Sequence, residues 1–258
     1  MIFVKGRLFL FFSLSFVTKK LRLKVWEKIP CKSLITEEKM ATQTLTRQEQ
    51  VEQANRKFIS KVYGWMAIAL VISGFSALYT ANSYTLINLI WGSRFGFLFL
   101  AIAELVLVFW LSASIHKISK TAATIAFIGY SILNGMTFSS IFVMYTTASI
   151  FRVFLASAAM FGAMTIYGMF TKRKLNSVGR YLMMGLFGVI IATLLNFLFR
   201  SSTLDFIISL VTLAIFIGLT AYDTQKIIKV SSYNDGSETF QKVAIICALE
   251  LYLDFINI

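Results

Sequence analysis

Long apolar stretches separated by short polar segments fill most of this chain. Seven of them match the length of about 20 residues that an α-helix needs to cross roughly 30 Å of hydrocarbon. They cover residues 62–81, 95–115, 122–145, 151–171, 181–199, 206–229 and 241–258. None contains proline, because Pro30 is the only proline in the sequence. The pattern predicts an all-α, polytopic membrane protein in which residues 62–258 form a domain of seven transmembrane helices.

The residues before this domain follow a different pattern. A mostly apolar run at 8–17 comes after two basic residues, is too short to span a bilayer and resembles the core of a signal peptide. No small-residue cleavage site follows it. We interpret residues 1–39 either as a signal-like segment or, preferably, as an upstream extension of the gene model, with Met40 as the natural start. Residues 40–61 are polar and are predicted to form a helical cytoplasmic segment.

Basic residues between the apolar runs predict the orientation, since cytoplasmic loops carry an excess of Lys and Arg. Thirteen fall on one side of the predicted bundle and three on the other. The majority are Arg47, Arg56, Lys57, Lys61, Lys117, Lys120, Lys172, Arg173, Lys174, Arg180, Lys226, Lys229 and Lys242, and the minority are Arg94, Arg152 and Arg200. We therefore expect a plasma-membrane protein with a cytoplasmic N-terminus and, after seven crossings, an external C-terminus.

Composition excludes most soluble and enzymatic functions. Hydrophobic residues make up 57% of the chain and charged residues 14%, against roughly 25% charged residues in soluble domains. With one histidine and two cysteines, the sequence lacks the residues for a histidine metal site, a Ser-His-Asp triad, a zinc cluster or a disulfide framework. The net charge of +13 is divided among short loops rather than gathered on one face. We expect a lipid environment, no enzymatic activity, no bound cofactor and no nucleic-acid partner.

Carboxylates within the apolar runs are the candidate functional residues. They are Glu104, Asp223, Glu250 and Asp254. An ionised carboxylate near the centre of a bilayer costs roughly 2.5–3.5 kcal/mol on insertion scales, so each needs a physical explanation. Glu104, in the second run, is either a proton or cation ligand or a hydrogen-bonded acid that pins its helix to a neighbour such as Asn134 or Asn196. The sequence leaves both interpretations open.

The last two runs contribute the other three carboxylates. Asp223 lies near the cytoplasmic end of the sixth run, where pairing with Lys226 or Lys229 is the structural alternative. Glu250 and Asp254 have the i, i+4 spacing that places both side chains on one face of a helix. Asp254 lies about 18 Å along its helix from the predicted cytoplasmic entrance, close to the middle of the membrane. We predict that the three carboxylates line a polar cavity.

Such a cavity has a definite chemistry. Carboxylates held close together cannot all ionise without a compensating cation, and their protons titrate as a coupled set. Hard cations such as Ca²⁺ prefer oxygen ligands of this kind, although the spacing itself does not select calcium. Protons and cations therefore compete for the same oxygens, which predicts pH-dependent cation binding or permeation.

Several segments together resemble the Bax inhibitor-1 family of transmembrane Bax-inhibitor-motif proteins. They are Ala221-Tyr222-Asp223, the stretch 249–257 (LELYLDFIN), Leu133-Asn134-Gly135-Met136-Thr137 and Glu104. The resemblance covers about residues 55–258, and the stretch in the last run is its most specific part. It implies a seven-helix fold with the last helix central. It also implies a calcium leak pathway in which Asp223 and Asp254 form a pH-sensing pair and contact calcium.

The resemblance further implies a latch. In relatives, a basic residue near the cytoplasmic end of the second helix holds the aspartate of the sixth. This sequence has Ile115-His116-Lys117 there and no arginine, so His116 and Lys117 are the latch candidates. If His116 fills the role, closure itself titrates near neutral pH.

Two other functions follow from comparison with known membrane proteins. Some bacterial relatives resemble regulators of a membrane-anchored AAA protease, for which residues 40–61 are the candidate docking tail. An intramembrane aspartyl protease is disfavoured, because Leu251, Tyr252 and Leu253 precede Asp254 in place of a Gly-x-Gly run and no proline follows Pro30.

Overall fold

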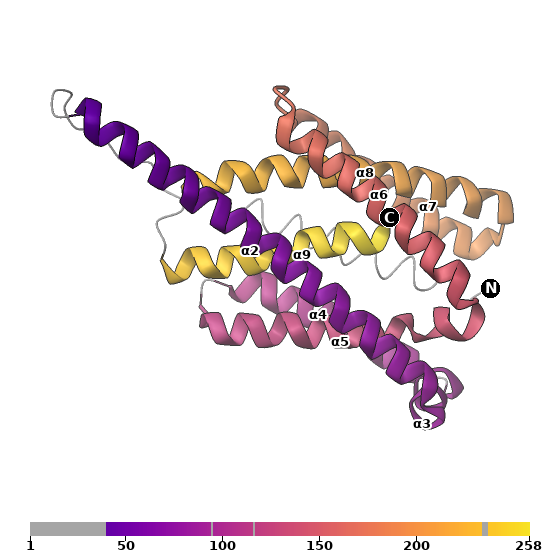
Figure 1. Cartoon of the computed structure of the whole chain (residues 1–258). Helices are drawn as coiled ribbons and strands as arrows, with labels where there is room; N and C mark the ends of the chain where they lie inside the picture. Colours follow the sequence, from indigo (N-terminus) through magenta and orange to yellow (C-terminus); the bar gives the residue numbers. More distant parts are fainter. Residues whose placement is uncertain (1–39, 94, 116, 234–236) are drawn as a thin grey trace.

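The computed structural model describes residues 40–258 except 94, 116 and 234–236, with side chains from residue 52 onward (Figure 1). The interpretations of residues 1–39 lie outside these described residues. The described part is helical and contains no β-strand. Its elements are α2 (Met40–Asn82), α3 (Tyr84–Ile87), the π-helical turn η1 (Asn88–Gly92), α4 (Gly96–Ser114), α5 (Lys120–Met144), α6 (Thr147–Phe170), α7 (Asn176–Phe199), α8 (Ser202–Ser231) and α9 (Glu238–Asn257).

Among the described helices, six are long and apolar enough to cross a membrane. They are Glu52–Asn82 of α2 together with α4, α5, α6, α7 and α8. This finding confirms the all-helical, multi-pass architecture. α9 is not one of the six, because Lys242, Glu250 and Asp254 interrupt its apolar sequence. The seventh predicted transmembrane helix corresponds to α9, and its crossing of the membrane stays a prediction.

Polar caps define where several helices begin. Ser119, Thr146, Ser201 and Ser237 precede α5, α6, α8 and α9, and each side-chain oxygen accepts a hydrogen bond from a backbone N–H in the first turn. α7 ends at Arg200, which adopts a left-handed backbone conformation with φ of 53°. These ends allow two residues to link α5 to α6 and two to link α7 to α8.

α9 is buried along most of its length. Every residue from Ala244 to Phe255 is buried. In contrast, α4, α6 and α7 expose large apolar side chains such as Phe99, Phe170 and Phe199. α9 contacts α2, α5, α6 and α8. The helix with the most buried acids thus has protein neighbours, while the more apolar helices present surfaces suited to lipid.

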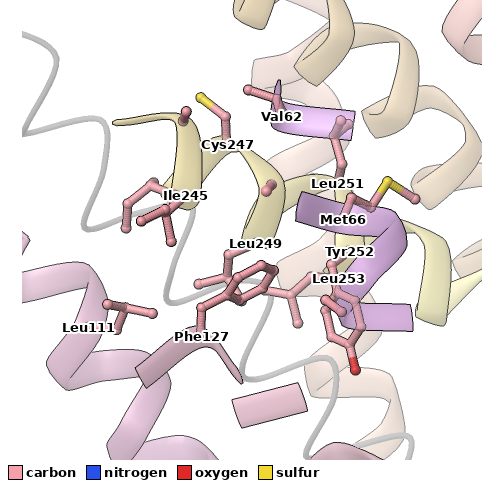
Figure 2. Close-up of a cluster of buried hydrophobic side chains, with 14 of the residues drawn as sticks. Val62, Met66, Leu111, Phe127, Ile245, Cys247, Leu249, Leu251, Tyr252 and Leu253 are labelled. Carbon is pink, nitrogen blue, oxygen red and sulfur yellow. The ribbon is translucent and has the colours of Figure 1, made fainter. Parts of the chain in front are cut away.

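Apolar side chains hold α9 against its neighbours (Figure 2). Val62 and Met66 come from α2, Leu111 from α4 and Phe127 from α5. The rings of Phe127 and Tyr252 meet edge to face, with their centroids 6.1 Å apart. This packing fixes the rotation of α9 and so decides which neighbours its polar side chains face.

Glycines allow two pairs of helices to approach closely. A Cβ atom on Gly168 of α6 would lie 2.6 Å from the carbonyl oxygen of Ala221 on α8, two residues before Asp223. A Cβ atom on Gly135 of α5 would overlap the backbone of Ser73 on α2. Both approaches therefore need a residue without a side chain, and they position the helices that carry the polar residues described next.

Candidate functional site

The four candidate carboxylates are all buried among the helices. The exposed fraction is 1% for Glu104, Asp223 and Glu250 and 0% for Asp254. A buried carboxylate is tolerated when it is paired with a cation, hydrogen-bonded or neutralised by a proton. The groups around each acid therefore decide what the region can do.

Glu250 is paired with a lysine from the neighbouring helix. Nζ of Lys226 donates a hydrogen bond to Oε1 of Glu250 at 2.9 Å, and the lysine side chain is 18% exposed while that of the glutamate is 1% exposed. The sequence suggested Lys226 and Lys229 as partners for Asp223. Lys229 is exposed. Lys226 forms an ion pair with Glu250 and thereby ties α8 to α9, and the pairing of Asp223 with a lysine stays a prediction.

Asp223 and Asp254 both lie near Tyr63 of α2. Each carboxylate is close enough to act electrostatically on the phenol hydroxyl of Tyr63. That hydroxyl is 3.1 Å from Oγ1 of Thr224, a hydrogen-bond contact between α2 and α8. The structure thus places an aspartate from α8 and an aspartate from α9 in the surroundings of one tyrosine.

Glu104 joins α4 to α5. Oγ1 of Thr137 donates a short hydrogen bond to Oε1 of Glu104. The sequence suggested Asn134 or Asn196 as the partner; Asn134 is buried one turn before Thr137, whereas Asn196 donates to Asp205 at 2.7 Å in the α7–α8 turn. The hydrogen-bonded interpretation of Glu104 therefore has a structural basis, with a threonine as the donor.

Tyr252 links the polar side of α9 to α2 and α5. It lies between Glu250 and Asp254 in the sequence, and its hydroxyl is 2.7 Å from Oγ of Ser73 on α2. Its ring centroid is 6.0 Å from that of Tyr130 on α5. The carboxyl group of Glu104 lies within electrostatic range of both tyrosines. Polar groups of α9 therefore face α8 on one side and the α2–α5 contact on the other.

Three consecutive side chains in the C-terminal part of α8 tie this helix to three different parts of the protein. Thr224 contacts α2 and Lys226 contacts α9, as described above. Between them, Oε1 of Gln225 accepts a hydrogen bond from the N–H of Leu175 at 2.9 Å, and its Nε2 donates to the carbonyl of Arg173 at 2.8 Å. This clamp follows Asp223 directly and fixes its position relative to α2, α9 and the α6–α7 loop.

The latch candidates lie in the segment between α4 and α5. Lys117 is exposed, and His116 lies outside the described residues. The proposed closure against Asp223 therefore stays a prediction.

The start of α9 holds this same segment in place. Oε1 of Glu238 accepts a hydrogen bond from the N–H of Lys120 at 3.1 Å, and Nζ of Lys242 donates to the carbonyl of Ile118 at 3.0 Å. A movement of α9 along its axis would consequently displace the α4–α5 segment through these two hydrogen bonds.

The described residues include no group of three or more His, Cys, Asp or Glu side chains arranged to hold a metal ion. Asp223 and Asp254 were predicted as calcium ligands, and calcium takes about six to eight oxygen ligands in a stable site. Calcium binding by Asp223 and Asp254 therefore stays a prediction.

A family comparison agrees with this arrangement. The sequence model described as "Inhibitor of apoptosis-promoting Bax1" matches residues 55–258. The chain belongs to the Bax inhibitor-1 family. The match includes Glu104, the clamp on α8 and the whole of α9, so the resemblance noted from the sequence is confirmed.

Bacterial members of the Bax inhibitor-1 family are similar along most of their length. "Inner membrane protein YbhL" of Escherichia coli is 44% identical over 203 residues, which cover 78% of this chain and 87% of YbhL. An uncharacterised protein of Borreliella burgdorferi is 42% identical over 215 residues, covering 83% of this chain and 93% of the relative. The printed name of YbhL places that relative in the inner membrane, and the described helices of this chain show a multi-pass membrane architecture.

The sequence pointed to the buried acids but missed several polar side chains that contact or flank them. Tyr63, Thr137 and Gln225 were not singled out, although each is a hydrogen-bonding side chain within or at the end of an apolar run. That placement was the available signal, because polar side chains within a membrane domain need partners from other helices. In this Bax inhibitor-1 family member, the result is a set of carboxylates surrounded by hydroxyl groups, an amide and one ammonium group.

Proposed function

We propose that this protein is a pH-sensitive cation leak channel of the Bax-inhibitor type, with calcium as a permeant ion and Asp223 and Asp254 as the proton-sensitive groups on its pathway. The observation that carries the proposal is the burial of both aspartates beside Tyr63, inside a bundle of membrane-spanning helices. Buried carboxylates in such a position mark ion and proton pathways in membrane proteins. The proposal involves no catalytic reaction and no resident cofactor.

The proposal includes α9 as a seventh crossing, enclosed by other helices. Its support is the continuous burial from Ala244 to Phe255 and the contacts with α2, α5, α6 and α8. A cytoplasmic N-terminus is part of the same proposal, supported by the excess of basic residues in alternate loops. In this orientation, the α8 clamp and the start of α9 face the cytoplasm.

Protons and cations act on the same oxygens in this mechanism. When Asp223 and Asp254 are ionised, they attract a cation, and each repels the other. When they bind protons, both effects disappear. Glu104 and Asn134 support the pathway from the α4–α5 side. Cation flux should therefore depend on pH through the aspartates, without a metal ion being held at rest.

Reconstitution tests this function directly. The protein is placed in liposomes that contain a calcium-sensitive dye, and calcium entry is measured between pH 6 and 8. Asp223→Asn and Asp254→Asn should each abolish most of the pH dependence. Asp205→Asn, at the α7–α8 turn and hydrogen-bonded to Asn196, is the matched control and should leave it unchanged. Unaltered pH dependence in both pathway variants would reject the proposal.

A second candidate function rests on the first turns of α2. The helix begins at Met40, although its apolar run begins only at Val62, and Figure 1 shows this end of α2 projecting beyond the other helices. A helical extension that projects from the bundle suits binding to a protein partner such as a membrane-anchored AAA protease. Deleting residues 40–51 should then change the turnover of that protease's substrates and leave calcium flux intact. Unchanged turnover would remove this candidate.

A further inference from the structure

The ion pair between Lys226 and Glu250 lies one helical turn from each aspartate of the proposed pathway. Lys226 follows Asp223 by three residues on α8, and Glu250 precedes Asp254 by four residues on α9. These spacings place side chains on the same face of a helix. The 2.9 Å contact therefore joins the two acid-bearing faces of α8 and α9.

The other lysines at the ends of these helices have different surroundings. Lys229 is exposed on the following turn of α8. Lys242 donates to the carbonyl of Ile118, at the α4–α5 segment. Lys226 is the lysine whose ammonium group is directed at a carboxylate of α9, and its side chain is 18% exposed. The carboxylates of Asp223 and Asp254 lie one helical turn from this pair, and both are within electrostatic range of the hydroxyl of Tyr63 on α2.

A lysine ammonium group is itself a cation bound to a carboxylate. Its hydrogen bond to Glu250 is charge-assisted, and solvent screens a buried pair much less than a surface pair. An inorganic cation that approaches Asp254 from the cytoplasmic side meets an oxygen that Lys226 already occupies. It also meets the repulsion of the ammonium charge, which grows in proportion to the charge of the ion.

We propose that Lys226 is a tethered cation that occupies Glu250 and thereby limits the passage of cations along α9, divalent ions more than monovalent ones. This inference rests on the proposed channel function and adds a specificity-determining residue to it. It makes Glu250 a carboxylate whose availability to ions is controlled by a residue of the same chain.

A charge cycle in liposomes tests the proposal. At pH 7.5, Lys226→Gln should raise calcium flux by about threefold or more, and should raise potassium flux by a smaller factor, since repulsion scales with ionic charge. Glu250→Gln leaves the ammonium group without its carboxylate and should lower calcium flux. The double variant should return towards the wild-type flux. Lys226→Arg keeps the charge and is the matched control, with flux close to wild type.

A chemical restoration of the charge guards against a folding artefact. Lys226→Cys is made in a background in which Cys31 and Cys247 are replaced by serine. Treatment with aminoethyl methanethiosulfonate attaches an ammonium group to the thiol and should lower the raised calcium flux towards the wild-type value. The neutral methyl reagent should have no such effect. Because the same reconstituted sample is measured before and after, the change reports charge rather than folding.

The outcomes separate this inference from the proposed function. If wild type, Lys226→Gln and Lys226→Arg have equal calcium flux while Asp223→Asn still loses pH dependence, the inference about Lys226 is overturned. The channel proposal then stands. If the wild type carries no pH-dependent flux, the channel proposal fails. The effect of calcium on the melting temperature of the detergent-solubilised protein then tests whether Lys226 occupies Glu250. Calcium should raise the melting temperature of Lys226→Gln and leave the Lys226→Gln, Glu250→Gln double variant unchanged. Absence of that difference overturns the inference.

Discussion

The hydroxyl of Tyr63 on α2 lies 3.1 Å from that of Thr224 on α8, directly after the buried Asp223. The contact joins helices separated by more than half of the chain, at the point where carboxylates of α8 and α9 act on the same phenol. Tyr63 is thus both a structural tie and a neighbour of the proposed pH-sensing pair.

Removing this hydroxyl should affect stability and pH response together. Tyr63→Phe loses one part-buried hydrogen bond, worth about 0.5–1.5 kcal/mol, so the melting temperature in detergent should fall by a few degrees. The pH profile of calcium flux should also change, because the aspartates lose a polar neighbour. Tyr79→Phe is the control on the same helix, since Tyr79 is 73% exposed. Identical behaviour of the two variants would contradict this role.

Substitutions of Gly168 and Gly162 on α6 give a test variant and a matched control for the close approach of α6 to α8. Gly168→Ala places a methyl group against the backbone of Ala221, and overpacking of this kind costs about 1–3 kcal/mol. Gly162→Ala meets nothing within 4 Å and should be neutral or stabilising by about 0.5–1 kcal/mol, because alanine favours helix. Thermal unfolding in detergent measures both, and equal melting temperatures would show that the close approach is not required.

Glu104 variants separate its structural and functional interpretations. Glu104→Gln keeps an oxygen for the hydroxyl of Thr137 and should fold with a melting temperature near wild type. Glu104→Ala and Thr137→Val break the contact and should each lose about 1.5–3 kcal/mol of stability, as expected for hydrogen bonds to charged groups. Calcium flux of Glu104→Gln is the deciding measurement. A flux close to wild type assigns Glu104 to structure, and a large loss assigns it to the pathway.

The start of α9 should control the mobility of the α4–α5 segment. Glu238→Ala removes the acceptor of the Lys120 N–H, so hydrogen exchange across residues 117–122 should become faster. Exchange is measured by mass spectrometry on the full chain in detergent. Glu52→Ala, which breaks an exposed pair with Arg56 on α2, should not alter exchange there. Slow exchange in Glu238→Ala would mean that other contacts hold the segment.

Helix positions were largely predictable because apolar length decides them. Each predicted run lies within a helix or overlaps one almost fully, and α5 to α9 begin two to five residues earlier than predicted. The reason is that their first turns contain polar residues and, except in α7, follow capping residues such as Ser237. The run at 62–81 continues back to Met40 as a single helix, since no proline interrupts the polar segment before it.

Pairings between helices were less predictable. The i, i+4 spacing correctly placed Glu250 and Asp254 on the same buried helix, but spacing within one helix does not reveal which neighbour that face meets. The pairing of Lys226 with Glu250, and that of Thr137 with Glu104, each depends on how two helices are rotated about their own axes. Those rotations follow from contacts such as Phe127 against Tyr252, which involve residues far apart in the sequence.

The burial of α9 also constrains how the protein is assembled in the cell. α9 follows α2 to α8 in the sequence, so the ribosome delivers it after every helix that surrounds it. Its two buried acids, Glu250 and Asp254, make it a poor substrate for independent insertion into lipid. Its partners Lys226 and Ser73 are by then already in place. The earlier helices therefore form the binding surface on which α9 packs. A defect in their packing should appear first as a failure of α9 to insert between them.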